Sequence, residues 1–347
     1  MGVGGAIDMD AVRSRWIWIA LIAALLVRIP AITTLPIDWD EPIYMEAAQG
    51  LNQALYAGDW EHVFDPQINP EHPGLVKSLF ALGFACFGSE PSLVERLMVV
   101  RGTSLLAGLG MVVLAARVHP VAGLAIALHT IHAKYSCQGY LDSIPALFMA
   151  LAMLLGWKHR DSSRYRPVIA CGAMWGAAIA GKWIHGLPGI ILLLGFKRWS
   201  TRFRLIAVTL ICLWLFDPTG WLHPVERYGE MLGLHRAYAH TVPLSTPWEP
   251  WISLAGGGPA VWHPEVFPWS IDAMLLTLGL MGLGMSLQSP WGRFLAAWFF
   301  LPMLVFMSWD TRWPQHLMVV LMPMCLAIVE ALRPLISRAS HHFEPSD

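Results

Sequence analysis

The stretch RWIWIALIAALLVRIPAITTLPIDWDEP, residues 15–42, is a long apolar run that ends at a cluster of carboxylates. A helix needs about 20 mostly apolar residues to cross the hydrocarbon core of a bilayer. The run follows Arg15 and contains no small-residue cleavage site of the kind that marks a signal peptide. Residues 16–35 are therefore predicted to form an uncleaved first membrane span, with Asp40 and Glu41 directly after it.

The composition of the whole chain extends this prediction. Hydrophobic residues make up 56% of the 347 positions and charged residues only 14%, as in polytopic membrane proteins. The net charge of −1 gives no support to nucleic-acid binding, which needs a concentrated basic face. We predict an all-α fold, a transmembrane helix bundle that forms one domain over residues 1–347. Its ten predicted spans lie near residues 16–35, 97–117, 119–136, 141–157, 167–183, 185–196, 203–218, 269–287, 291–309 and 315–332.

The positions of lysine and arginine orient the bundle, because cytoplasmic flanks are enriched in these residues. Ten crossings bring the basic segments 158–166 and 197–204 to the same side as Arg117 and Arg293. That side is predicted to be the cytoplasm, which holds both termini of a multi-pass protein. The preferred location is the plasma membrane of a bacterium or an archaeon.

Two long segments, 36–96 and 217–268, then lie on the outer face and hold much of the acidic charge. The apolar stretch 75–88 within the first of them is short for a crossing and contains Lys77. It is predicted to be a juxtamembrane helix on the outer face. Both segments are interpreted as outer loops of the same domain, since no repeat or linker divides the chain.

The carboxylates that follow the first span are candidates for chemistry. A carboxylate at this depth can act as a general base towards an acceptor hydroxyl, or help to hold a divalent cation against a phosphate. A solvated acidic cluster beside the membrane is the competing interpretation of Asp40 and Glu41. Asp142 returns to the same face at the start of the fourth span, so it can converge with Asp40. A helix N-cap explains Asp142 equally well, and the two roles are compatible.

Basic side chains gather on the same predicted face. Lys182 lies where an apolar run reaches the outer interface, and an ionisable group at that depth tends to face a cavity or a partner. The further candidates for an anionic ligand such as a phosphate are His72, Lys77, Arg96, Arg312 and His316. Snorkelling of long side chains towards the interface is the competing explanation.

In order and spacing these residues resemble the polytopic GT-C glycosyltransferases that use polyprenyl-phosphate sugars, particularly the protein O-mannosyltransferase and aminoarabinose transferase families. The matching elements are Asp40-Glu41, His72-Pro73-Gly74-Leu75 with Lys77, Arg96, Asp142, Gly181-Lys182, and Arg312 with His316. The resemblance implies an enzyme that transfers a hexose or pentose from the lipid carrier to an acceptor hydroxyl at the outer face. A single displacement at the anomeric carbon would invert its configuration.

The resemblance also implies roles for individual residues. Asp40 would be the catalytic residue, with Glu41 supporting it. The donor phosphate would be held by Asp142, Lys182, Arg96 and Arg312, with His72, Lys77 and His316 as further candidates. Members of the group differ over metal, so a divalent cation (Mg, Mn or Zn) at Asp40 and Asp142 stays open, and no other cofactor is expected.

Two departures from the group bear on the acceptor. The usual His-Pro-Pro-Leu is His72-Pro73-Gly74-Leu75 here, and the chain lacks the soluble domain that many relatives carry. A protein, a glycan or a lipid acceptor therefore stays open.

Two other classes compete with the enzyme. A membrane transporter would explain the helices and an acidic outer vestibule, but transporters usually place ionisable residues near the bilayer midplane in repeated halves. An assembly factor would present an apolar loop patch without converging charges. Acids and bases on one face favour the enzyme.

Overall fold

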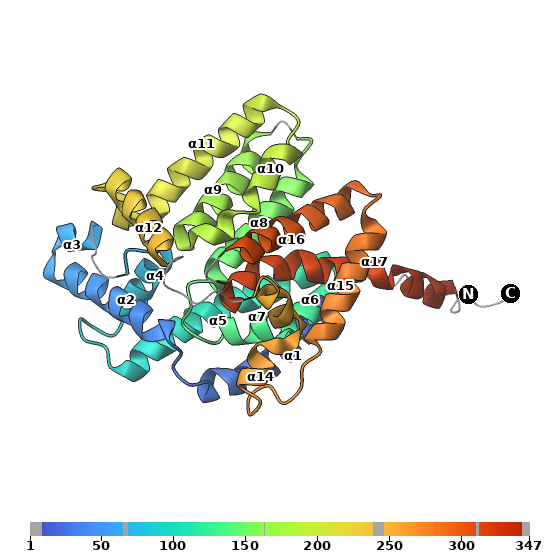
Figure 1. The fold of residues 1–347 in the computed structure, drawn as a ribbon, viewed down its shortest axis with the longest axis horizontal. Coiled ribbons are helices and arrows are strands. Elements are labelled where there is room, and N and C mark those ends of the chain that lie inside the picture. Colours follow the sequence, from blue (N-terminus) through green and yellow to red (C-terminus); the bar gives the residue numbers. More distant parts are fainter. Residues whose placement is uncertain (1–8, 65–68, 163, 239–245, 310–311, 342–347) are drawn as a thin grey trace, which may run out of the picture.

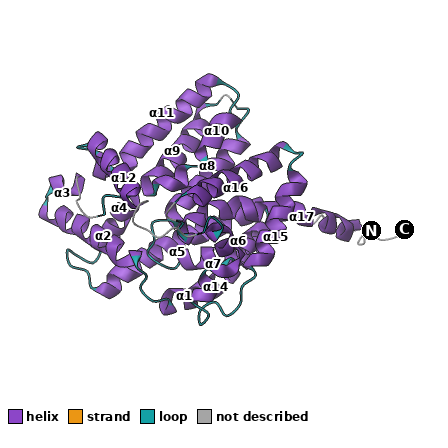
Figure 2. Ribbon diagram, viewed as in Figure 1, coloured by secondary structure: helices purple, strands orange, loops and turns teal. Residues whose placement is uncertain are grey.

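The computed structural model describes residues 9–64, 69–162, 164–238, 246–309 and 312–341, and within them it contains helices and no strand (Figures 1 and 2). The predicted all-α class is confirmed. The main helices are α1 (Met9–Thr34), α2 (Asp40–Ala57), α3 (Trp60–Phe64), α4 (Leu75–Ala85), α5 (Leu93–Val118), α6 (Pro120–Leu128), α7 (Thr130–Tyr135), α8 (Ser143–Lys158), α9 (Tyr165–Gly181), α10 (Gly189–Gly195), α11 (Trp199–Phe216), α12 (Pro224–Tyr238), α13 (Glu249–Ile252), α14 (Pro259–Trp262), α15 (Asp272–Ser286), α16 (Pro290–Ser308) and α17 (Met318–His341). Short turns of other helix types are η1 (Trp183–Gly186), η2 (Pro218–Gly220), η3 (Ser253–Gly257) and η4 (Pro314–Leu317).

All ten predicted spans coincide with helical segments. Among the described residues, five helices are long and apolar enough to cross a membrane: Ser14–Thr34, Leu93–Val118, Trp199–Phe216, Pro290–Ser308 and Pro314–Pro334. Shorter apolar helices include α8, α15 and the segment Trp183–Gly195. The chain is therefore a multi-pass helical membrane protein.

Two of the predicted spans are irregular. The third is split into α6 and α7 at His129, whose backbone is extended (φ −69°, ψ 124°). The fifth ends at Gly181, and Lys182 is again extended (φ −162°, ψ 113°) before η1 and α10. This break presents the Lys182 side chain at a helix end.

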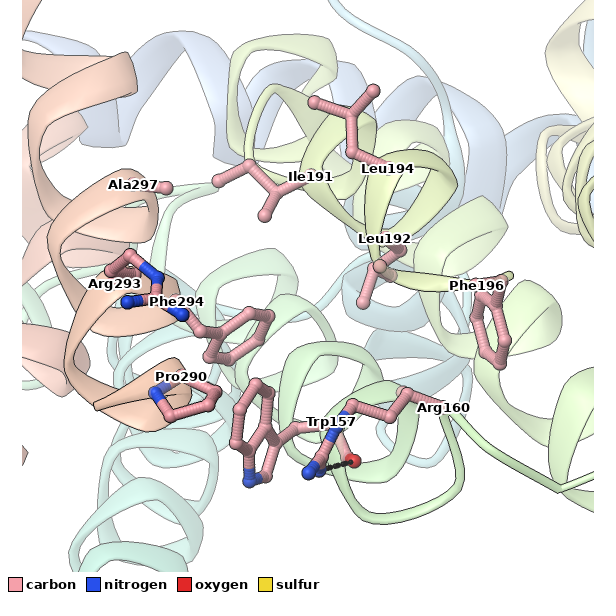
Figure 3. A pocket seen from close by; sticks show the side chains of 12 residues that line it. Trp157, Arg160, Ile191, Leu192, Leu194, Phe196, Pro290, Arg293, Phe294 and Ala297 are labelled. Atoms are coloured by element: carbon pink, nitrogen blue, oxygen red, sulfur yellow. Dashed lines mark hydrogen bonds between the residues drawn. The ribbon is translucent and has the colours of Figure 1, made fainter. Parts of the chain in front are cut away.

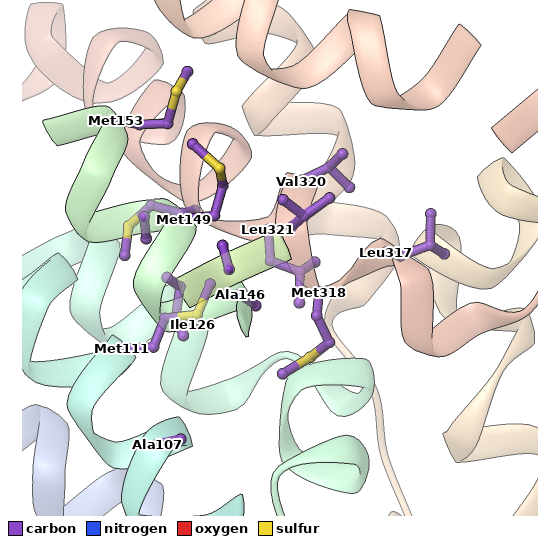
Figure 4. Packing of buried hydrophobic residues seen from close by; sticks show 14 of the residues in the cluster. Ala107, Met111, Ile126, Ala146, Met149, Met153, Leu317, Met318, Val320 and Leu321 are labelled. Atoms are coloured by element: carbon purple, nitrogen blue, oxygen red, sulfur yellow. The ribbon is translucent and has the colours of Figure 1, made fainter. Parts of the chain in front are cut away.

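Helix α17 forms the centre of the bundle. Its residues from Met318 to Ile328 are buried, as is Leu317 of η4, and they pack with side chains of α5, α6 and α8 (Figure 4). Small residues let neighbouring backbones approach closely in membrane bundles. At Gly282 of α15, an added Cβ would come within 1.8 Å of the carbonyl oxygen of Ala327. The contact between α15 and α17 therefore requires glycine at this position.

The two predicted outer segments form one end of the molecule. The segment 36–96 contains α2, α3 and α4, and the segment 217–268 contains η2 and α12 to α14. Helix α4 matches the short helix predicted over 75–88. In Figure 1, α2, α3, α4 and α12 gather on the left, whereas α17 extends to the opposite end. That the left-hand end is the outer face stays a prediction from the basic residues.

Candidate active site

Asp40 is the first residue of α2, at the end of the bundle where the two outer segments meet. A carboxylate in the first turn of a helix is favoured by the helix dipole. Its Oδ2 accepts hydrogen bonds from the Tyr44 hydroxyl at 3.3 Å and from Nε2 of Gln315 at 3.4 Å. Burial raises the pKa of Asp40 above its usual value, the positive charge of Lys182 lowers it, and the negative charge of Asp142 raises it. Asp40 is thus a half-buried carboxylate with increased basicity.

Asp142 is fully buried between two basic side chains. Lys182 donates from Nζ to Oδ2 at 2.9 Å, and Nε2 of His185 lies 2.7 Å from Oδ1. Asp142 occupies the N-cap position of α8 without making a capping hydrogen bond. Its side chain instead holds Lys182 in place.

Two histidines complete this group. His72 and His316 are buried, and both interact electrostatically with Lys182 and Asp142. Burial, together with the charges of Lys182 and Lys77, lowers the pKa of His72 well below its usual value. Its imidazole is therefore neutral near pH 7, and its Nδ1 has no hydrogen-bond partner among the described residues. The structure thus brings five of the predicted site residues together, namely Asp40, Asp142, Lys182, His72 and His316.

Glu41 points away from solvent and is fully buried. Its oxygens accept from Nε and Nη2 of Arg101 at 2.9 and 2.8 Å. They also accept from the backbone N–H groups of Gly139 at 2.6 Å and Asp38 at 3.0 Å. These four bonds tie the start of α2 to α5 and to the segment before α8. Glu41 therefore fixes the backbone on which Asp40 lies.

Lys77 of α4 is engaged by backbone oxygens. Its Nζ donates to the carbonyls of Asn69 at 2.7 Å and His72 at 2.8 Å, with Oδ1 of Asn69 at 3.5 Å. The side chain is 1% exposed. Lys77 therefore stabilises the loop that carries His72.

The two predicted arginines lie at helix ends. Arg96 is in the first turn of α5, and its Nε is buried without a hydrogen-bond partner among the described residues. Arg312 donates from Nη2 to the carbonyl of Met307 at 3.1 Å, near the end of α16. Neither observation links these arginines to the carboxylate of Asp40.

The contacts of Gly74 explain why glycine stands where the His-Pro-Pro-Leu pattern has its second proline. The N–H of Gly74 donates to Oδ1 of buried Asp217 at 2.7 Å, and Thr219 donates to the same oxygen at 2.6 Å. The Tyr228 hydroxyl donates to the other oxygen at 3.1 Å. A Cβ at Gly74 would lie 2.4 Å from Cγ2 of Thr219. Asp217, which the sequence did not single out, therefore joins the two outer segments through a glycine N–H that proline lacks.

An aromatic cluster lies beside Lys182. Trp183 donates from Nε1 to Nε2 of His235 at 2.8 Å, and its ring is 5.2 Å from that of Trp309. The ring of His235 is in turn 5.8 Å from that of His72. Aromatic faces of this kind can stack on a sugar ring or an isoprenoid chain. In the sequence, this cluster could be suspected only from Trp183, which directly follows Lys182.

The carboxylates at this end do not fit a shared divalent cation. Asp38, Glu41 and Asp142 are each paired with a lysine or arginine. Among the described residues no group of three or more histidine, cysteine, aspartate or glutamate side chains has the arrangement of a metal site. Asp40 is the one carboxylate of these four without a lysine or arginine bonded to it, so the four residues do not fit a divalent cation.

No protein-family model matches the chain, and no curated protein matches it in sequence. Solved structures do match it in fold. The crystal structure of ArnT from Cupriavidus metallidurans bound to undecaprenyl phosphate aligns with a TM-score of 0.63 and 15% identity, over 96% of this chain and 62% of that one. The apo oligosaccharyltransferase from Archaeoglobus fulgidus aligns with a TM-score of 0.57 and 12% identity, over 97% and 52%.

The chain shares its fold with ArnT and with the archaeal oligosaccharyltransferase. A third matching structure is the archaeal oligosaccharyltransferase AglB from Archaeoglobus fulgidus in complex with an inhibitory peptide and a dolichol-phosphate, with a TM-score of 0.56 and 14% identity over 99% of this chain. The chain spans about half to two thirds of the length of these proteins. The similarity in fold therefore extends over nearly all of this chain but over only part of each of the matching proteins.

Proposed function

We propose that the protein transfers a sugar from a polyprenyl-phosphate carrier to an acceptor hydroxyl at the outer face of the plasma membrane. The observation that carries the proposal is the position of the Asp40 carboxylate beside the Lys182–Asp142 pair. The fold supports it, because ArnT and AglB have been solved with undecaprenyl phosphate and a dolichol-phosphate. The active site would be the end of the bundle formed by the two outer segments.

The reaction follows as a single displacement. The acceptor oxygen attacks the anomeric carbon from the face opposite the phosphate, and its proton passes to a carboxylate oxygen of Asp40. The bond from the anomeric carbon to the phosphate oxygen breaks, and its electron pair leaves with the polyprenyl phosphate. Inversion at the anomeric carbon is the expected outcome.

Lys182 stabilises the departing phosphate in this scheme. One of its N–H groups is directed to Asp142, which leaves two donors on the ammonium group for phosphate oxygens. Charge-assisted hydrogen bonds to a phosphate are stronger than neutral ones. His72, as a neutral N–H donor, and His316 would contact the same phosphate in this scheme, with Asp142 and Glu41 as positioning residues. Arg96 and Arg312 are proposed as contacts for the remainder of the carrier.

The test is turnover of polyprenyl-phosphate sugars by the purified protein in lipid nanodiscs. A panel of hexose and pentose donors is offered, and release of the polyprenyl phosphate is measured. We expect Asp40→Asn to lower turnover by about 10²-fold or more, as for loss of a general base, while its thermal unfolding stays close to that of the wild type.

EDTA provides a second arm of this experiment. Since the carboxylates do not fit a shared cation, turnover is expected to survive EDTA. Full turnover of Asp40→Asn would remove this residue from the chemistry. Absence of turnover with every donor, together with uptake of a solute into vesicles, would favour the transporter.

A further inference from the structure

A second site lies at the other end of the bundle. A cavity of about 410 Å³ opens between the last turn of α8, the end of α10 and the first turns of α16. Helix α8 has 16 residues, so at 1.5 Å per residue this cavity lies about 24 Å from Asp142, which precedes the same helix. It is therefore separate from the Asp40 cluster and does not depend on the proposed function.

The walls of the cavity are apolar. Figure 3 shows Ile191, Leu192 and Leu194 of α10 on one side, with Phe294 and Trp157 facing them from α16 and α8. Cavities of roughly 300–1,000 Å³ with such walls are typical of sites for small molecules and lipids. A hydrocarbon chain is the ligand portion that such walls would bind.

Two arginines line the same cavity. Arg160 and Arg293 lie on either side of Trp157 and Phe294 (Figure 3). The guanidinium of Arg160 lies 3.7 Å from the centre of the Trp157 ring and donates from Nη1 to the Trp157 carbonyl at 2.9 Å. Its Nε is 3.6 Å from the exposed carboxylate of Asp161.

Arg293 donates from Nη1 to the carbonyls of Gln288 at 3.1 Å and Leu287 at 3.4 Å. Each guanidinium carries five N–H donors, so both have further donors for an anion. Asp161, the acidic neighbour of Arg160, is itself paired with Lys197 at 2.7 Å. The end of the cavity thus carries an excess of positive charge.

We propose that this cavity binds one anionic glycerophospholipid, with an acyl chain against α10 and the headgroup phosphate between Arg160 and Arg293. The distribution of basic residues assigns this end to the cytoplasmic face, and basic pockets between helices on that face suit anionic headgroups. The turns before α9, α11 and α16 all meet at this end, so the bound lipid would stabilise the packing of α8, α10 and α16.

The test is native mass spectrometry of the full chain released from nanodiscs that contain equal amounts of phosphatidylglycerol and phosphatidylcholine. The wild type is expected to retain one phosphatidylglycerol. Arg160→Gln removes a phosphate contact, and Ala297→Trp fills the cavity from α16 without changing the charge. Arg160→Gln is expected to lower retention by about tenfold, as for loss of one charge-assisted contact. Ala297→Trp is expected to lower retention at least as much, because its ring occupies the space of the acyl chain.

The matched control is Arg204→Gln. Arg204 also stacks on an aromatic ring, lying 4.4 Å from the centre of Tyr165, at the same end but outside the cavity. It should retain the lipid like the wild type, and thermal unfolding checks that each variant is folded. Equal retention of the two lipids, loss in Arg204→Gln as large as in Arg160→Gln, or retention of a polyprenyl phosphate instead would each overturn the proposal.

Discussion

At the scale of single residues, the charge balance around Asp40 determines the expected pH dependence. The pKa of this carboxyl is raised above 3.8 by burial, and the charges of Lys182 and Asp142 act on it in opposite directions. A general base must be deprotonated, so kcat/KM is expected to fall as the pH falls through this raised pKa. The midpoint on the acid side should therefore lie above the usual value for aspartate.

Two substitutions should move that midpoint in opposite directions. Lys182→Met removes the charge that lowers the pKa of Asp40, so the acid side of the profile moves to higher pH. Asp142→Asn removes a charge that raises this pKa, so it moves to lower pH. The pH–rate profiles of the two variants measure these shifts. Shifts in the same direction would mean that Asp40 is not the group that titrates.

Glu41 gives a prediction about stability. Glu41→Gln leaves the guanidinium of Arg101, 6% exposed, without its counter-charge. Breaking a buried ion pair on one side costs about 3–5 kcal/mol, so a clear fall in the unfolding temperature in detergent is expected. The half-buried Asp40→Asn should change it little. A Glu41→Gln protein of normal stability but without turnover would instead give Glu41 a chemical role.

The sequence singled out candidate residues of the site but not the residues that hold them in place. Asp40, Asp142 and Lys182 were singled out because each lies at the end of a predicted span on the same predicted face. Arg101 could not, since it lies inside a predicted span with no feature that distinguishes it from a snorkelling arginine. His185 was likewise missed, because its bond to Asp142 joins residues 43 positions apart in the chain.

At the scale of helices and loops, the start of α4 depends on Gly74. Gly74→Pro restores the usual His-Pro-Pro-Leu pattern. It also removes the N–H group that donates a hydrogen bond to Asp217, and its side-chain atoms would clash with Thr219. An unsatisfied buried group costs about 1–3 kcal/mol, and thermal unfolding should show at least this loss. Gly102→Ala, with open space around its Cβ position, is the control and should be neutral. Equal stability of the two variants would contradict this account of the glycine.

Helix breaks show where sequence periodicity fails. The predicted third span has neither proline nor glycine near His129, so nothing local ends α6 there. The break exposes the N–H of Thr130, which donates to Oδ1 of Asp272 at 3.1 Å. The Thr130 hydroxyl donates to the other oxygen of the same carboxylate. A residue 142 positions away in the sequence therefore stabilises the break. The hydrophobic pattern around His129 could not predict it.

At the scale of the whole molecule, the positions of the apolar helices along the chain could be predicted because each apolar segment must satisfy its own backbone in the bilayer. The packing of the outer segments could not, since it depends on single polar contacts such as that between Gly74 and Asp217. The orientation in the membrane is predicted from the basic turns, which lie at the end of the bundle opposite the Asp40 cluster.

Native Cys86 reports on this orientation, because it is exposed at the end of α4, whereas Cys137, Cys171 and Cys325 are buried and the half-buried Cys212 lies inside the apolar helix α11. A membrane-impermeant maleimide should label Cys86 in right-side-out vesicles. In a Cys86→Ser background, Ser200→Cys places the thiol at the exposed start of α11. This variant should react only in inside-out vesicles. The reverse pattern would put Asp40 on the cytoplasmic side, where an acceptor could no longer approach from outside the cell.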